Sequence, residues 1–467
     1  MAAQAQVDVG GILRPQGSLD PSTALRPYSE RLGSRAAAHL LRRAGFGGTA
    51  DEIRRYGSMH AGEAVSLLLD AKASPGPTPD LVNAQAPLTR RDVRDVLDEL
   101  QLWWLNAMLS SPAPLSEKLT LYFHGHFTSR ATPRFPRITY QQNALFRSYA
   151  LGNLRELTRA VSKDPAMLIY LNGGANVAAH PNENFARELM ELFTLGLGNF
   201  TEQDVRESAR AWTGWHVDRR SASAQFNPAL HDGGSKRFLG RTGNFNGDDV
   251  VNIIFAQPQC ARFFATSLLN WFVYNNPEPQ LVETVAAMLR AHDFELRPVV
   301  AAILQSDVFY SARAYRALVK SPVEFVVGTY KVLGLSKLDA GALPALAQMG
   351  QRLFFPPSVA GWPGGQNWLT SGTMIARQNF LTRVLGAQGL SASVWLHGLP
   401  LTPQDVSKRL AQTILQGDAA PAALFELQGY LGGAGSAALG TLSVENYDQR
   451  LRGAAYLAMA TPAYQLN

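Results

Sequence analysis

Apolar residues recur every three or four positions along most of this chain, which is the period of a helix with one buried face. The runs with this period lie at 91–111, 115–126, 140–163, 183–195, 202–213, 258–274, 278–292, 297–306, 322–333 and 403–415. A further run begins near Ser34 and ends at Gly45–Gly48. Alternating strand patterns are scarce, and no repeat of 20–50 residues is present. The pattern predicts a mainly α fold with little or no β structure.

Helix starts are marked by a hydroxyl residue followed three positions later by an acidic residue. This arrangement satisfies the first N–H groups of a helix, which have no partner within the helix itself. The four cases are Thr49–Glu52, Thr201–Asp204, Ser321–Glu324 and Thr402–Asp405. We therefore expect helices to begin directly after Thr49, Thr201, Ser321 and Thr402.

Two segments interrupt the helical pattern and are predicted to be long irregular loops. Residues 215–250 are rich in Gly, Asn and Ser and alternate weakly, so a short hairpin within them is compatible with the pattern. Residues 354–372 contain too much Pro and Gly for a helix. Long loops inside a compact domain often carry function.

The same pattern suggests three parts of the chain. Residues 1–29 have no periodicity and are expected to form an irregular arm, and 30–390 form the main helical domain. Residues 391–467 are expected to be a C-terminal helical segment packed on that domain.

Composition narrows the class of protein. The chain has 467 residues, of which 46% are apolar and 17% charged, and its single cysteine, Cys260, cannot form an internal disulfide. No apolar run reaches the roughly 18 residues of a membrane-spanning helix. The first residues have neither a basic region nor an apolar core, so no signal peptide is predicted and the default compartment is the cytoplasm.

Cys260 either has a lowered pKa at a helix start or is a small buried side chain.

Charge gives little indication of a nucleic-acid partner. The 43 Lys and Arg residues exceed the 37 Asp and Glu residues by six, which is a mild excess over this length. The densest basic segment contains Arg130, Arg134 and Arg137. It is read either as a solvated loop or as a contact for an anionic substrate.

The run 183–195 is the helix richest in candidate chemistry. Asn182 is expected to cap it, and Glu183 suits the positive end of the helix dipole. Glu188 and Glu191 are one turn apart, so their carboxylates can share a proton or bind one cation. The alternative is a solvated acidic face on which Arg187 and Arg210 pair with these glutamates.

His124 and His126 can act together only if the helix ends before them. In a helix that continues through Gly125, the two side chains point about 200° apart and cannot form a ligand pair. In an extended chain they face the same side and an H-x-H metal pair becomes available. The third reading for His126 is a hydrogen-bonded core histidine.

The two loops supply further candidates. His231, Asp232 and Lys236 surround a Gly-Gly turn, where Asp232 either orients the imidazole, binds a metal ion or caps its own backbone. Trp362 and Trp368 either line a pocket or fill the core. The sequence contains no H-E-x-x-H, G-x-S-x-G, Walker A or dinucleotide-binding motif.

Several of these segments resemble the bacterial family catalogued as domain of unknown function 1800. They are AAHLLRRAGFGGTADEI (37–53), LSEKLTLYFHGHFTS (115–129), MLIYLNGGANVAAHPNENFARELMELFTLGLGNFTEQDVRESARAWTGW (167–215), HDGGSKRFLG (231–240) and FFPPSVAGWPGGQNWL (354–369). The resemblance implies a large helical domain without an established activity, and members are often exported beside secreted partners. The positions that match the family pattern are His126, Asn182, Glu183, Asn184, Arg187, Glu188, Glu191, Trp215, His231, Asp232, Lys236, Gly240, Gly361 and Trp362.

Two classes of function stay open. The first is a hydrolytic or metal-assisted enzyme with a polar cleft formed by 183–195, the segment around His126 and the loop 231–240. Its predicted catalytic residues are Glu188, Glu191, His126, His231, Asp232 and Lys236. Its predicted substrate-binding residues are Asn182, Asn184, Arg187, Trp215 and Trp362. A divalent metal ion, if bound, would take His126, Glu188, Glu191 and His231 as ligands.

The second class is a non-catalytic binding or assembly protein. In that case the same polar residues form a structural network that holds the helices together, and the tryptophan-rich loop contacts a protein partner.

Overall fold

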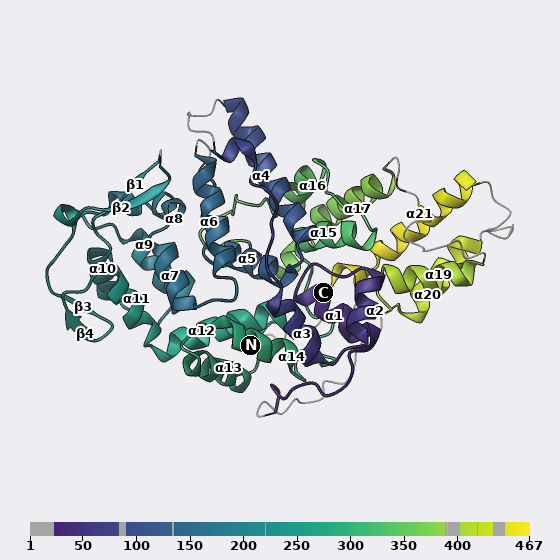
Figure 1. The fold of residues 1–467 in the computed structure, drawn as a ribbon, viewed down its shortest axis with the longest axis horizontal. Helices are drawn as coiled ribbons and strands as arrows, with labels where there is room; N and C mark the ends of the chain where they lie inside the picture. The colour runs from purple at the N-terminus through teal and green to yellow at the C-terminus, as the bar shows by residue number, and fades with distance from the viewer. Residues whose placement is uncertain are drawn as a thin grey trace. The chain divides into compact units, whose positions relative to one another are not determined.

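The computed structural model describes residues 23–83, 90–132, 135–219, 221–387, 390, 402–417, 419–432 and 444–467. The chain divides into two compact units (Figure 1). Unit 1 comprises Met1–Val65, Leu304–Gly350 and Gly364–Asn467, and unit 2 comprises Ser66–Ile303 and Gln351–Pro363. Helices dominate both units, which confirms the mainly α prediction. Residues 1–22 of the predicted arm, residues 391–401 and Arg134 lie outside the described residues.

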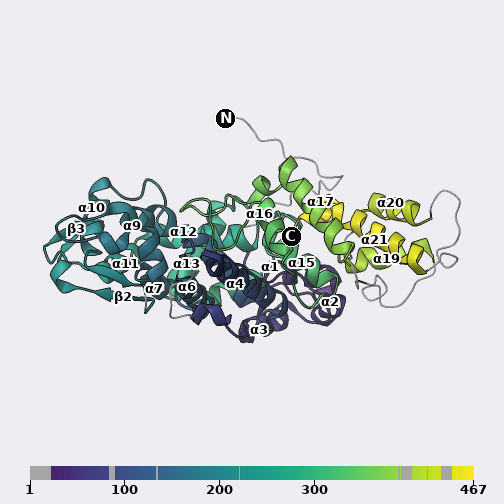
Figure 2. The ribbon, with the colours of Figure 1, turned by 90° about the horizontal axis from the view of Figure 1, so that it is seen from above.

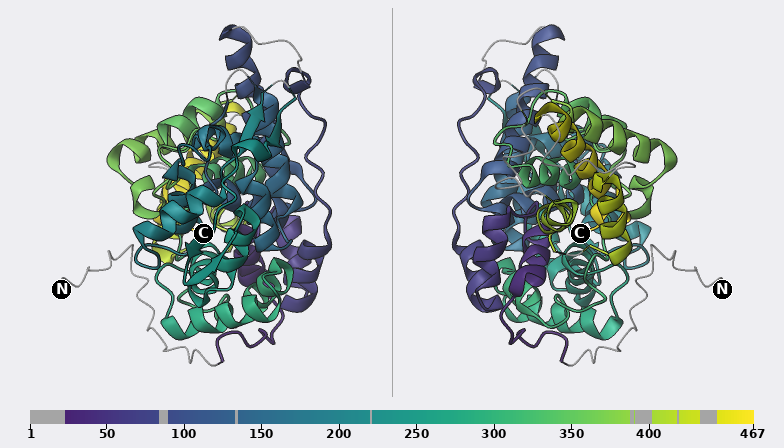
Figure 3. Two further views of the ribbon diagram at one scale, coloured as in Figure 1. Left: turned by 90° about the vertical axis from the view of Figure 1, so that its left-hand side faces the viewer. Right: turned by 90° about the vertical axis from the view of Figure 1, so that its right-hand side faces the viewer.

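Unit 1 consists of helices that buried arginines connect by hydrogen bonds. Its elements are α1 (Gly33–Arg43), α2 (Ala50–Gly57), α15 (Pro322–Val332), α16 (Ala342–Gln348), η5 (Gly365–Trp368), α17 (Ser371–Leu385), α19 (Pro403–Thr413), α20 (Pro421–Gly432), α21 (Val444–Ala460) and η7 (Pro462–Gln465). Helices α19, α20 and α21 lie side by side (Figure 2), and α21 packs on α17 (Figure 3). Buried Arg377 donates to the Lys320 carbonyl and to the Gln465 side chain. It thereby joins α17 to η7.

Unit 2 contains the candidate chemistry. Its helices are η1 (Asp80–Asn83), α4 (Arg90–Ser110), α5 (Pro114–His126), α6 (Pro136–Ser148), α7 (Leu154–Ser162), α8 (Pro165–Tyr170), η2 (Gly173–Ala175), α9 (Glu183–Glu188), η3 (Leu189–Thr194), α10 (Glu202–Ala211), η4 (Pro228–Leu230), α11 (Gly247–Phe255), α12 (Pro258–Phe272) and α13 (Pro279–Ala291). Helices α3 (Ala61–Asp70) and α14 (Leu296–Gln305) carry residues of both units. Within the described ranges, no helix is both long and apolar enough to cross a membrane.

The predicted helix starts are correct where a cap marks them. Thr49, Thr201 and Ser321 each accept a hydrogen bond from the backbone N–H of the acidic residue three positions later. The carboxylate of that acidic residue in turn accepts a hydrogen bond from the backbone N–H of the capping residue. Thr402 accepts from the Asp405 N–H in the same way. One prediction is wrong, because the run 140–163 is two helices, α6 and α7. The break follows from Asn153, whose side chain caps α7 by accepting from Arg155 and Glu156.

The insertion 215–250 is more regular than predicted. It forms two antiparallel hairpins, β1 (Trp215–Asp218) with β2 (Ser223–Phe226), and β3 (Lys236–Phe238) with β4 (Arg241–Gly243). Ala222 in the first turn packs on Ile138 of α6 and Ala166 of α8 in a small apolar cluster. Each hairpin has only two strands and depends on such helix contacts for its stability.

The segment Gln351–Pro363 of unit 2 packs on the end of α5. Gly361 has a φ of 77°, and a Cβ atom there would lie 2.6 Å from the Gly125 carbonyl oxygen. Only glycine allows both the left-handed conformation and this close approach. Trp362 is thereby held 5.4 Å, ring to ring, from His124.

A buried ion pair joins α5 to α6. Glu117 has no exposed side-chain area, and its two oxygens accept from Arg147 Nε at 2.6 Å and Nη2 at 3.0 Å. The Trp104 indole on α4 donates to the same carboxylate at 3.0 Å. Three helices therefore share one carboxylate, and removing its cation leaves an uncompensated buried charge.

We expect Arg147→Met to lower the free energy of unfolding by about 3–5 kcal/mol, because Glu117 then stays buried without its cation. The double variant Glu117→Gln with Arg147→Met recovers a large part of this loss, since a neutral amide still accepts from Trp104. Urea unfolding of both variants measures the difference. Equal losses in the single and double variants would contradict this account.

Candidate functional site

The predicted helix 183–195 is helical throughout but changes type. Asn182 caps α9 by accepting from the Asn184 N–H at 3.0 Å, as predicted. From Leu189 to Thr194 the helix becomes a π-helix, in which Thr194 Oγ1 donates to the Leu189 carbonyl. Insertions of this type are rare and occur frequently at functional sites. Glu188 lies directly before the π-turn and Glu191 within it.

Glu188 and Glu191 are partly buried carboxylates. Burial and the adjacent Glu191 charge raise the pKa of Glu188 above its usual value, and Arg187 opposes them only weakly. Within the described part of the chain, neither carboxylate accepts a hydrogen bond or forms an ion pair. These two groups can therefore reach a ligand without first breaking an internal contact.

Tyr170 and Arg130 complete this cluster, which we call the carboxylate cluster: Arg130, Tyr170, Glu188 and Glu191. The pKa of Tyr170 is raised by partial burial, lowered by the Arg130 charge and raised by the Glu188 charge. Both charged groups therefore lie close enough to act on the phenol. Arg130 belongs to the basic segment seen in the sequence. Tyr170 was not predicted, because nothing in the hydrophobic pattern distinguishes it from a core tyrosine.

Arg187 is used for structure. Its guanidinium donates to both oxygens of Glu202 on α10 at 2.7 and 2.8 Å, and to Glu183 at 3.3 Å. These contacts raise the pKa of Arg187. Asn184, which was also predicted to bind substrate and lies on the same helix, is exposed. The ion pairs connect the start of α9 to α10.

Asp232 contacts both Arg210 and Lys236, whereas His231 contacts Thr213. Asp232 accepts from Arg210 Nε at 2.7 Å and Nη2 at 3.2 Å, and from the Gly234 N–H at 2.9 Å. Arg210 therefore holds the pKa of Asp232 below its usual value. Lys236 Nζ donates to the Asp232 and Gly234 carbonyls, and burial lowers its pKa. His231 Nδ1 donates to the Thr213 carbonyl at 3.0 Å.

The two histidines of α5 face different surroundings, because the helix continues to His126. His126 Nε2 donates to the Phe193 carbonyl at 2.9 Å, and burial lowers the pKa of His126 to about 4. His124 Nε2 accepts from the Phe354 N–H at 3.1 Å, and burial lowers its pKa to about 3. Both imidazoles are therefore neutral near pH 7, and they cannot act as an H-x-H pair.

The residues predicted to bind a metal ion, His126, Glu188, Glu191 and His231, do not form a set of metal ligands in the described structure. In the described ranges, no group of three or more His, Cys, Asp or Glu residues is arranged to hold a metal ion. His126 uses Nε2 on Phe193, and His231 uses Nδ1 on Thr213. Metal binding stays a prediction that elemental analysis of the purified protein would test.

The two tryptophans of the predicted substrate site differ in their surroundings. Trp215 stands opposite Phe226 in the β1–β2 hairpin, with ring centroids 5.4 Å apart, and Lys163 Nζ lies 5.6 Å from its ring. Trp362 packs against the buried His124.

Cys260 is fully buried, and burial raises its pKa well above the usual value. Of the two predicted alternatives, it is therefore the small buried side chain.

Asp164 is a buried ionisable residue that the sequence analysis missed. It caps α8 by accepting from the Met167 N–H at 3.1 Å, and it also accepts from Gln142 Nε2 at 2.8 Å. Ser129 in turn donates to Gln142. Burial raises the pKa of Asp164 to about 7. The Asp-Pro pair at 164–165 indicates the cap, but only the tertiary structure buries it.

One family profile matches residues 39–466, with the description "Protein of unknown function (DUF1800)". No curated protein and no solved structure matches the chain.

We expect Asp164→Asn to change how stability depends on pH. From about pH 4 to about pH 7 the folded protein keeps a proton that the unfolded chain has released, so this group lowers the free energy of unfolding by about 1.4 kcal/mol per pH unit. The asparagine variant lacks this decrease, so its stability relative to the unmodified protein rises with pH and levels off above about pH 7. Urea unfolding across this range measures the difference. Parallel pH profiles would show that Asp164 titrates normally.

Proposed function

The chain belongs to the family described as DUF1800, a protein of unknown function, and we propose that it is a hydrolytic enzyme whose working groups are Glu188 and Glu191. One observation supports this: they are partly buried carboxylates at a π-turn that neither accept a hydrogen bond nor form an ion pair with any described residue. The other charged residues of the predicted site, Arg187, Asp232 and Lys236, are held in internal contacts.

The pair has the properties that acid–base hydrolysis requires. Burial and the neighbouring Glu191 charge raise the pKa of Glu188, which suits Glu188 to the role of the acid. Glu191 takes the role of the base. Glu188 donates its proton to the leaving atom as its bond to the substrate breaks. Glu191 accepts a proton from the water molecule whose oxygen forms the new bond. Proton exchange with solvent then restores both groups.

Arg130 and Tyr170 would assist as positioning groups. Arg130 supplies a positive charge that acts on Tyr170, where it would balance negative charge that develops on a substrate bound at this phenol. The raised pKa keeps the Tyr170 hydroxyl protonated at neutral pH, so it can donate a hydrogen bond to a substrate oxygen. Neither residue takes up the transferred proton.

The non-catalytic alternative has its own supporting observation. Arg187 joins α9 to α10, and Arg210 with Asp232 joins α10 to the loop before β3. If Glu188 belonged to such a network, it would contribute to stability as Asp232 does. The two functions therefore predict opposite effects for Glu188→Gln.

We expect Glu188→Gln to raise the free energy of unfolding at pH 7 slightly, because it removes a carboxylate that burial and Glu191 disfavour. The gain is small because solvent screens this partly exposed group. Since the pKa of Glu188 is raised, this gain shrinks as the pH falls and disappears below about pH 4, where the carboxyl is protonated in both states. Asp232→Asn is the matched control with a lowered pKa. It should cost about 1–2 kcal/mol at pH 7, and this cost disappears as the pH falls through the pKa of Asp232. A loss of stability in both variants would favour the structural role.

Activity is tested with a panel of chromogenic p-nitrophenyl glycosides, carboxylic esters and phosphate esters. For a compound that the unmodified protein hydrolyses, we expect Glu188→Gln and Glu191→Gln each to lower kcat by about 10²–10⁴-fold. Glu202→Gln, which breaks the ion pair with Arg187, should change kcat little. Full activity in both Glu188→Gln and Glu191→Gln would contradict the assignment.

A further inference from the structure

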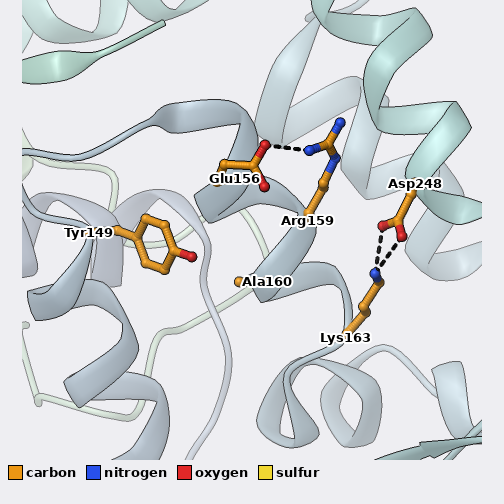
Figure 4. A pocket seen from close by; sticks show the side chains of 6 residues that line it. All are labelled: Tyr149, Glu156, Arg159, Ala160, Lys163 and Asp248. Carbon is orange, nitrogen blue, oxygen red and sulfur yellow. Dashed lines mark hydrogen bonds and ion pairs between the residues drawn. The ribbon is translucent and has the colours of Figure 1, made fainter.

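A hollow of about 370 Å³ lies on unit 2 between α7 and α11 (Figure 4). Glu156, Arg159, Ala160 and Lys163 lie on one face of the chain through α7 and its C-terminal end. Tyr149 comes from the end of α6 and Asp248 from the first turn of α11. Figure 4 shows Tyr149 on one side and two ion pairs on the other, with Ala160 between them. The hollow is shallow, open to solvent and lined mainly by polar groups.

The charges around the hollow cancel. Arg159 pairs with Glu156, and Lys163 Nζ lies 2.6 Å from one oxygen of Asp248 and 2.7 Å from the other. Arg159 also donates to Asn252 on α11. Two cations and two anions leave no net charge, so the hollow selects neither an anion nor a cation.

The paired groups remain accessible. The side chains of Arg159, Lys163, Asp248 and Glu156 are 24%, 29%, 46% and 48% exposed. Such partly exposed pairs contribute little to stability, so their atoms can turn toward a ligand at small cost. Each pair presents a donor beside an acceptor, and Tyr149 adds an aromatic ring and a hydroxyl.

We propose that this hollow binds a neutral saccharide. Neighbouring sugar hydroxyls both donate and accept, which matches the adjacent carboxylate and cation of each ion pair. The C–H face of a sugar ring packs on an aromatic ring such as Tyr149, and Ala160 leaves room for it. An apolar ligand is disfavoured because it would strip water from four charged groups. The proposal is independent of the carboxylate cluster.

The test is isothermal titration of the full chain with cellotriose, maltotriose, xylotriose and chitotriose as neutral probes. Trigalacturonate serves as the anionic probe and the chitosan trimer as the cationic one. We expect a neutral trisaccharide to bind at least about tenfold more tightly than either charged probe.

Variants locate the binding. Tyr149→Ala and Asp248→Asn should each weaken it at least about tenfold, while Tyr149→Phe retains the ring and most of the affinity. Tyr430→Ala, at a partly exposed tyrosine of α20, is the control and should leave affinity unchanged. The proposal is overturned if no neutral trisaccharide binds at about 10 mM, a concentration that reaches weaker than millimolar affinity. It is equally overturned if a charged probe binds more tightly, or if binding survives both Tyr149→Ala and Asp248→Asn.

Discussion

The ion pair between Glu117 and Arg147 is the contact on which the arrangement of unit 2 depends. A carboxylate with no exposed area is costly to bury without a cation, so the packing of α5 on α6 has to keep Glu117 beside Arg147. The same two helices carry His126, which donates to the Phe193 carbonyl, and Gln142, which donates to Asp164. Trp104 adds α4 to the same contact. His126 and Gln142 therefore lie on two helices that this buried ion pair joins.

Several charged residues in and around α9 and α10 follow one rule. Arg187, Asp232 and Lys236 have ionic or hydrogen-bond partners on neighbouring elements, and these contacts connect α9, α10 and the loop before β3. Glu188 and Glu191 depart from the rule within the described residues, and the helix changes to a π-helix beside them. Burying a carboxylate without a partner costs free energy. The proposed acid–base role of Glu188 and Glu191 would account for this cost.

Local structure was predictable wherever a backbone group had a nearby partner. The caps at Thr49, Thr201, Ser321 and Thr402 lie three residues from the groups they satisfy, so sequence spacing identifies them. The break between α6 and α7 was missed, because the apolar period continues across Asn153 and the competing cap is a single amide. The hairpins in 215–250 were underestimated, since Ala222 packs on helices from distant parts of the chain. Tyr170 and Asp164 were missed for the same reason.

The sequence by itself determined the helical class and the capped boundaries, because these depend on contacts within a few positions. It also carries the family pattern and the residue types available for chemistry directly. The tertiary structure alone decided which residues are partnered. Asp232 is bound to Arg210, 22 positions away, and His126 to the Phe193 carbonyl, 67 positions away. Whether a carboxyl is paired, buried or accessible sets its pKa and its reach toward a ligand. Those properties come from side chains that the fold brings together, and spacing along the chain carries no record of them.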